Sequence, residues 1–231
     1  MNLFCIPYAG GSANIFLPWK RHLPEINVIP VELKGRGRRF DESVYQSVEE
    51  AVEDILSTIE SDLQTDNYAI FGHSMGGILA FELYIRIKQM GKSKPAHIFF
   101  SGCKPPHLRK PEEQKTYSLP TEQLTKKIAE MGGTPQEILS NPELLDIFLP
   151  VIRADYRMIE TYSYQREESL ESDISILIGD QDSFSFDEAC EWKKLSKGDM
   201  QIYTLEGNHF FIHHQTQNVM NIIRNRLKTI L

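Results

Sequence analysis

The chain has 231 residues, of which 41% are hydrophobic and 25% charged, values that fit one globular domain and exclude a disordered chain. Its net charge of −7 argues against general attraction to nucleic acid. The first residues lack the basic and apolar regions of a signal peptide, and no apolar run approaches the roughly 18 residues that span a bilayer. Cys5, Cys103 and Cys190 are odd in number and far apart, so we expect reduced thiols in a soluble, cytoplasmic protein that binds no membrane.

Short apolar strands alternate with segments of helical periodicity along the chain. The predicted strands cover 3–8, 28–33, 68–72, 97–102, 174–178 and 201–205. Most are continuously apolar, which is typical of strands buried on both faces of a parallel sheet. Helices are predicted over 47–63, directly after Ser74, and over 218–231, and they should cover the faces of that sheet. The pattern predicts an α/β fold.

The segment between the fourth and fifth predicted strands is too long for a simple crossover. Helix-start signals occur at T-P-Q-E, residues 134–137, and at N-P, residues 141–142. The predicted helices cover 121–131, 135–140 and 143–163, the last disturbed by Pro150. We therefore expect a single domain over 1–231 that carries a helical lid inserted at about 108–150.

The sequence F-G-H-S-M-G-G, residues 71–77, stands where a buried strand passes into an apolar helix. The G-x-S-x-G pattern is weak alone, but a nucleophile elbow requires this strand-turn-helix context. The sharp turn strains the serine backbone, and only small neighbours such as Gly72 and Gly76 avoid a clash. The structural alternative is a serine that merely caps the helix. The context favours Ser74 as a nucleophile.

A serine hydroxyl needs a base to remove its proton, and in this type of site an acid and then a histidine follow the serine along the chain. The segment I-L-I-G-D-Q-D-S-F offers Asp180 and Asp182, and the spacing from Gly179 favours Asp182. After the last strand, L-E-G-N-H-F-F-I-H-H offers His209 directly behind the glycine turn, with two further histidines beyond it. Asp155 is a weaker candidate acid because it lies in a helix before the fifth strand.

An acyl-transfer site also needs N–H donors for the oxyanion. Met75, after the nucleophile, should supply one, and P-Y-A-G-G-S-A, residues 7–13, should supply another through Ala9 or Tyr8. Alternatively, residues 7–13 simply connect a strand to a helix. Two histidines spaced by four residues mimic half a metal site, but no third ligand accompanies them, so we expect no metal.

The sequence G-R-G-R-R-F, residues 35–40, follows a predicted strand and resembles a dinucleotide-binding fingerprint. It lacks the third glycine, and the next predicted helix starts too late for phosphate binding. We expect Arg36, Arg38 and Arg39 to form either a solvated turn or part of a docking surface for an anionic partner.

Five segments together resemble the type II thioesterases that accompany nonribosomal peptide and polyketide synthetases, which have the α/β-hydrolase fold. These segments are PYAGGSA, LKGRGRRF, FGHSMGG, LIGDQDSF and GNHFFIHH, in the order and spacing of that family. The resemblance implies Ser74 as nucleophile, His209 as base, Asp182 as its partner, and Met75 and Ala9 around the oxyanion. The chain departs from the pattern at Lys34 and Asn208, where the family usually has proline and glycine; neither change removes a reacting group.

The resemblance further implies an editing hydrolase that takes part in antibiotic biosynthesis. Such an enzyme removes unwanted acyl groups from acyl or peptidyl carrier proteins. The phosphopantetheine arm would belong to the substrate, and no cofactor is needed. A local basic patch for docking acidic carriers is expected at Lys104, His107, Arg109 and Lys110. We expect a monomer. A carboxylesterase or lipase-like hydrolase is the enzymatic alternative, and a non-catalytic binding protein of the same fold is the other.

Overall fold

The computed structural model describes residues 1–63, 67–109, 115–164 and 168–228. Its centre is a six-stranded sheet in the order β2-β1-β3-β4-β5-β6, in which every neighbouring pair is parallel. The strands are β1 (Asn2–Ile6), β2 (Asn27–Pro30), β3 (Tyr68–His73), β4 (His97–Ser101), β5 (Asp173–Gly179) and β6 (Met200–Leu205). β3 and β4 are buried at every position, as the continuous apolar runs predicted. The predicted α/β fold is confirmed.

The order of the strands determines where a ligand can bind. The chain passes from β1 outward to β2 and then returns to the other side of β1 as β3. The loops that follow β1 and β3 therefore diverge, and the crevice at the carboxyl ends of such strands is where open α/β sheets bind ligands. The loop after β1 is the predicted oxyanion loop, and β3 leads into Ser74. The topology thus brings two distant motifs to one point.

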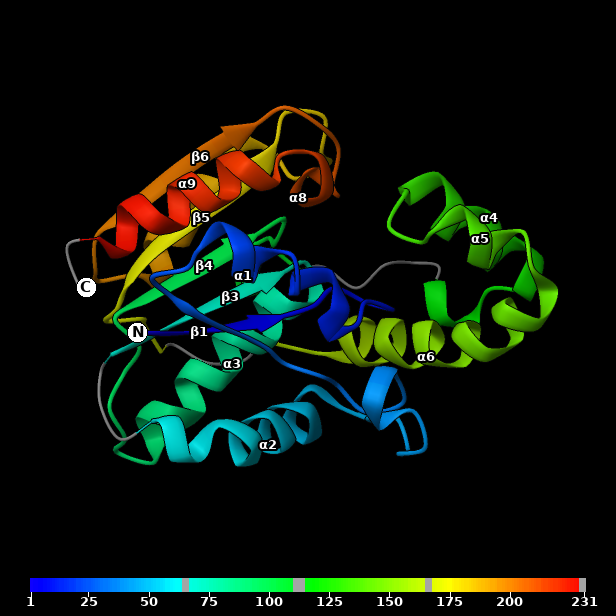
Figure 1. Cartoon of the computed structure of the whole chain (residues 1–231), viewed down its shortest axis with the longest axis horizontal. Coiled ribbons are helices and arrows are strands. Elements are labelled where there is room, and N and C mark those ends of the chain that lie inside the picture. The colour runs from blue at the N-terminus through cyan, green and yellow to red at the C-terminus, as the bar shows by residue number, and fades with distance from the viewer. Residues whose placement is uncertain (64–66, 110–114, 165–167, 229–231) are drawn as a thin grey trace.

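Helices cover both faces of the sheet (Figure 1). They are α1 (Trp19–His22), α2 (Val48–Ile59), α3 (Met75–Gln89), α7 (Phe186–Cys190), α8 (Phe211–His214) and α9 (Thr216–Leu227). α2 and α3 pack on one face with the larger apolar core, whereas α1 and α9 pack on the other with a second one. α3 is buried at nearly every position, which agrees with the apolar helix predicted directly after Ser74.

Three helices form the insertion between β4 and β5. They are α4 (Thr121–Met131), α5 (Gln136–Leu139) and α6 (Pro142–Thr161). In Figure 1, α4 and α5 project at the right beyond the sheet, and α6 runs from them back to the core. The insertion has its own small apolar cluster, made by Leu119, Leu124, Ile128, Leu149 and Ile152. The insertion therefore has apolar packing of its own, in addition to the residues that α6 contributes to the main core.

Local signals within the insertion are only partly followed. The Asn141 side chain accepts hydrogen bonds from the backbone N–H groups of Glu143 and Leu144, as the N-P signal predicted. The helix expected from residue 135 begins at Gln136, after Pro135 and without a side-chain cap. The predicted disturbance at Pro150 does not interrupt α6. Within the part of the chain that the structure describes, no helix is both long and apolar enough to cross a membrane.

Candidate active site

Ser74 lies in a strained turn between β3 and α3. Its φ is 54° and its ψ is −114°. Among the described residues, it is the only residue other than glycine that has a positive φ. A Cβ at Gly72 would lie 2.1 Å from the carbonyl oxygen of Gly76, and a Cβ at Gly76 would lie 2.2 Å from that of Ile6. Both glycines are therefore required by close backbone approach. This is the geometry of the predicted nucleophile elbow.

The Ser74 hydroxyl is the first member of a hydrogen-bonded chain of three side chains. Its Oγ lies 2.9 Å from Nε2 of His209, and Nδ1 of His209 lies 2.7 Å from Oδ2 of Asp182. Because an ionised carboxylate only accepts, Nδ1 carries the proton and donates it to Asp182. In the neutral imidazole, Nε2 then accepts the Ser74 O–H. The three side chains are thus oriented so that His209 can accept the proton of the Ser74 hydroxyl.

The competing carboxylates have other partners. Asp180 accepts the backbone N–H of Gly207 at 2.8 Å, so its side chain stabilises a turn instead of contacting His209. Asp155 is buried but pairs with Arg36 through two contacts of 2.7 Å. Asp182 follows β5 with a side chain only 3% exposed. Asp182 is therefore the carboxylate in contact with His209.

The other histidines near the site are held elsewhere. His213 Nε2 lies 3.0 Å from the Tyr8 hydroxyl, and burial lowers the His213 pKa below its ordinary value. His73 is fully buried, with Nδ1 2.9 Å from Ser101 Oγ. Burial lowers the His73 pKa well below its ordinary value, and charge on His209 would add to this. Both imidazoles therefore stay neutral at pH 7, and His209 is the one that contacts Ser74.

The segment that leads into the predicted oxyanion loop approaches the turn at Ser74, since a Cβ at Gly76 would lie 2.8 Å from the Pro7 carbonyl oxygen. Met75 begins α3, so its backbone N–H belongs to the unsatisfied donors of a helix N-terminus. In the loop after β1, Gly10 donates its N–H to Asp155 at 2.7 Å, and Gly11 donates to the Tyr8 carbonyl at 2.9 Å. Those two N–H groups are occupied, so Tyr8 and Ala9 stay the candidate donors of the loop.

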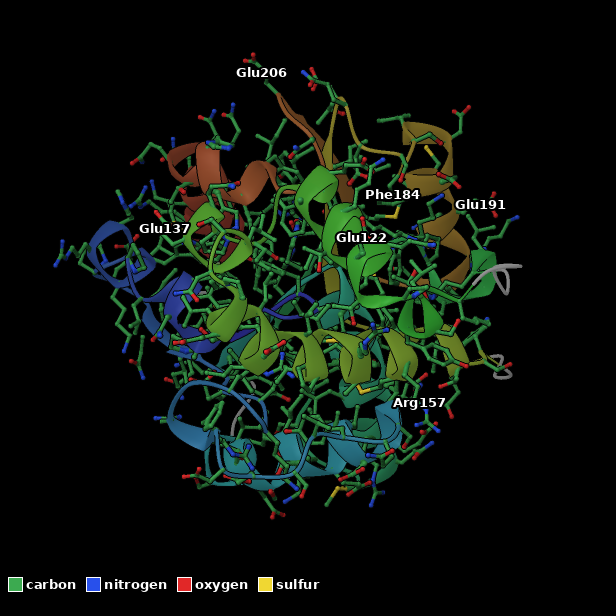
Figure 2. The ribbon with its side chains drawn as sticks, turned by 90° about the vertical axis from the view of Figure 1, so that its right-hand side faces the viewer. Glu122, Glu137, Arg157, Phe184, Glu191 and Glu206 are labelled. Atoms are coloured by element: carbon green, nitrogen blue, oxygen red, sulfur yellow. The ribbon has the colours of Figure 1, made fainter. Side chains whose placement is uncertain are left out.

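A cavity of about 780 Å³ opens at Ser74, between the carboxyl ends of the strands and the insertion. Met131 from α4 and Phe184 from the segment after β5 form apolar parts of its wall. Figure 2 faces the insertion, with Glu122 of α4 and Glu137 of α5 labelled in front and Phe184 in the segment after β5. The cavity volume lies in the range of small-molecule sites, so a flexible arm with a short acyl group can be accommodated.

The predicted basic patch is partly neutralised. Lys104 pairs with Glu188 at 2.6 Å, and His107 lies 3.3 Å from Glu191. Arg109 donates to the Ile159 carbonyl at 3.3 Å and lines the cavity together with Lys104. Lys110 lies outside the described residues.

The arginine loop differs from the sequence expectation. Arg36 is only 3% exposed and its guanidinium binds Asp155, so neither a solvated turn nor an exposed docking residue describes it. Arg39 pairs with Asp54 and Glu42, and Arg38 alone of the three is exposed. The reason is tertiary: a carboxylate from a helix far along the chain reaches Arg36. The sequence gives no local signal of that partner.

Comparison with known proteins shows the family of the chain. A family profile described as a thioesterase domain matches residues 1–227. The chain belongs to the thioesterase family. It is 35% identical to the protein named linear gramicidin dehydrogenase LgrE of Brevibacillus parabrevis, over 99% of this chain and 88% of LgrE.

Solved structures of the family superpose closely. ClbQ from the colibactin pathway has a TM-score of 0.93 at 34% identity, covering 99% of this chain and 97% of ClbQ. The type II thioesterase BorB from the borrelidin biosynthetic cluster has a TM-score of 0.89 at 31% identity, covering 98% and 92% of the two chains. The similarity includes the insertion as well as the sheet, because nearly the whole of each chain is covered.

Proposed function

We propose that this chain is a type II thioesterase that hydrolyses acyl groups from the phosphopantetheine thiol of carrier proteins in nonribosomal peptide or polyketide synthesis. The hydrogen-bonded chain Ser74–His209–Asp182 at the mouth of the cavity is the observation that carries the proposal. The names of relatives such as BorB, a type II thioesterase, support the choice of substrate. The acyl carrier protein would be the partner of a monomeric, cytoplasmic enzyme, with α4 to α6 as a lid on a single domain.

The geometry supports a two-step reaction. His209 Nε2 takes the Ser74 proton as Oγ attacks the thioester carbonyl, and the N–H groups of Met75 and Ala9 stabilise the oxyanion. Imidazolium His209, stabilised by Asp182, then protonates the departing thiolate. Water attacks the acyl-Ser74 ester with His209 as base, which releases the carboxylic acid and restores Ser74. Every proton in this cycle is carried by these side chains, so the proposal includes no cofactor.

Two other readings are less well supported. The word dehydrogenase belongs to the name of LgrE; here Gly35 to Phe40 lack the third glycine of a dinucleotide fingerprint and lead into a 3-10 turn, Gly37–Arg39, instead of a helix N-terminus. A carboxylesterase would share the Ser74 chemistry. Relative rates on oxygen esters and carrier-bound thioesters separate that activity from the proposed one.

The first test uses acetyl-phosphopantetheinyl carrier protein and intact-protein mass spectrometry. We expect wild type to remove the acetyl group and Ser74→Ala to leave it in place, because no other hydroxyl contacts His209 Nε2 among the described residues. Ser57→Ala, on the exposed side of α2, is the matched control and should keep wild-type activity. Wild type that spares the carrier but cleaves a nitrophenyl ester would contradict the proposed substrate and support the esterase.

A further inference from the structure

Three buried charged side chains surround the loop after β1. Glu32 is 5% exposed, Arg36 is 3% exposed and Asp155 is 2% exposed. Removing charges from water costs several kcal/mol per ion, and apolar residues of similar size often stabilise a fold at least as well. Stability alone therefore does not account for placing three charges here.

All three side chains bind the main chain of the same loop. Asp155 Oδ2 accepts the Gly10 N–H at 2.7 Å, and Arg36 Nη1 donates to the Gly11 carbonyl at 3.1 Å. Glu32 Oε1 accepts the Ala13 N–H at 2.9 Å. The contacts hold three peptide groups just beyond Ala9, the residue whose N–H is proposed for the oxyanion.

Arg36 fixes the direction of the Asp155 carboxylate. Nη1 lies 2.7 Å from Oδ2 and Nη2 lies 2.7 Å from Oδ1, a bidentate pairing that leaves the carboxylate one orientation. In that orientation Oδ2 also receives the Gly10 N–H. Burial alone would lower the pKa of Arg36, but the neighbouring Asp155 carboxylate outweighs it and the pKa lies above its ordinary value. The guanidinium therefore keeps its charge beside the Asp155 carboxylate.

Asp155 links this loop to the insertion. It lies on α6. Before it in that helix, Leu149 and Ile152 pack in the apolar cluster of the insertion, and after it Met158 and Ile159 pack in the main core. One turn before Asp155, Ile152 also contacts the loop: a Cβ at Gly10 would lie 2.7 Å from its Cγ1. One helix thus holds Gly10 by a hydrogen bond and by packing.

We propose that Arg36 and Asp155 are positioning residues: by fixing the Ala9–Gly10 peptide they orient the adjoining Tyr8–Ala9 peptide, which carries the Ala9 N–H, so that the oxyanion hole forms only when α6 is seated against the loop. The inference rests on the proposed function for the role of Ala9. It makes the lid helix a support of the chemistry in addition to a cover for the cavity. Neither side chain contacts the reacting atoms, so their effect is exerted through the loop.

The discriminating variant replaces the pair by apolar residues, Arg36→Met together with Asp155→Leu. Such replacements of buried ion pairs often preserve stability, so the variant should fold while Gly10 loses its acceptor. We expect kcat to fall on the order of 10- to 100-fold, and KM to change by less than about two-fold. The fall in kcat should not exceed the roughly 100-fold or larger fall that follows removal of an oxyanion donor itself. An alkyl boronic acid, whose tetrahedral adduct on Ser74 needs the same hole, should lose affinity by the same factor.

The matched control is Asp54→Asn. Asp54 also binds an arginine, Arg39, through two contacts of 2.7 and 2.9 Å, but its own partners are Arg39, Tyr45 and Lys34 and none belongs to the loop after β1. It should leave kcat and boronate affinity unchanged. A folded double variant with wild-type kcat and boronate affinity would overturn the proposal. Should that double variant fail to fold, Arg36→Ala together with Asp155→Ala is judged by the same two measurements, because it leaves no unpaired charge and no acceptor for the Gly10 N–H.

Nitrophenyl acetate serves as a second substrate for every variant. It needs the oxyanion hole but no carrier protein, so it tests the positioning role separately from the carrier-protein function. If wild type cleaves only the ester, the proposed function fails, whereas a parallel loss of esterase kcat and boronate affinity in the double variant still supports the positioning role.

Discussion

The two walls of the cavity at Ser74 are built differently. The sheet wall carries Ser74, Asp182 and His209 at the ends of three parallel strands, where glycine turns and short hydrogen bonds leave little freedom. The other wall, formed by α4 to α6 of the insertion and called the lid wall after the proposed lid, has an apolar cluster of its own with five buried members among the described residues. The difference suggests a division of labour: the sheet wall determines whether a bond breaks, and the lid wall determines what reaches it.

The largest expected effect comes from the sheet wall. In Asp182→Asn, the amide no longer holds the proton on Nδ1 of His209, so Nε2 loses its fixed acceptor role, and kcat/KM should fall roughly 10³- to 10⁴-fold. Asp180→Asn is the matched control, because an amide oxygen can still accept the Gly207 N–H that Asp180 binds. Steady-state kinetics with the acyl-carrier substrate measures both. Equal losses in the two variants would show that turn geometry, and not the contact to His209, matters.

A smaller effect separates the stabilities of the two walls. Leu124 in α4 and Leu79 in α3 are both fully buried, so each change to alanine should cost about 2–5 kcal/mol. Leu79→Ala should lower the free energy of global unfolding. Leu124→Ala should mainly promote local opening, because its neighbours belong to the lid cluster.

Hydrogen exchange with peptide resolution checks this expectation. Amides of residues 121–131 should exchange faster in Leu124→Ala while those of β3 keep their protection, and Leu79→Ala should accelerate exchange in both. Loss of β3 protection in Leu124→Ala would mean that the lid and the sheet unfold as one unit, and the proposed division between the two walls would fail.

The same division explains what could be read from sequence. The sheet and the Ser74, His209 and Asp182 contacts were predictable, because strand ends with glycine turns are local signals and parallel topology brings them together. The ionic contact of Arg36 with Asp155 was not predictable, because Asp155 lies within a helix and no strand end or glycine turn marks it as the partner of a buried arginine. For Tyr8, the sequence predicted only a backbone N–H donor. Its hydroxyl, however, contacts both Gly133 and His213, and no local sequence pattern relates these two residues.

The smallest expected effect concerns that hydroxyl, where the walls meet. Tyr8 lies 3.2 Å from the Gly133 carbonyl in the turn after α4, and 3.0 Å from His213 Nε2. Burial raises the pKa of Tyr8 to about 12, so the neutral phenol donates to Gly133 while His213 donates to it. Tyr8→Phe should weaken this attachment of the lid by about 1 kcal/mol. Because the lid then holds the substrate less well, KM should rise roughly five-fold while kcat changes little.

The ring of Tyr8 should remain in place in that variant, because it packs edge-on against Phe210 and His73. Tyr203→Phe on β6 is the control and should change neither constant. Faster exchange of the amides at 131–134 would accompany the rise in KM if the hydroxyl fastens the lid. A fall in kcat at constant KM would instead place the Tyr8 hydroxyl in the chemistry of the sheet wall, because a lid attachment acts on substrate retention and not on proton transfer at Ser74.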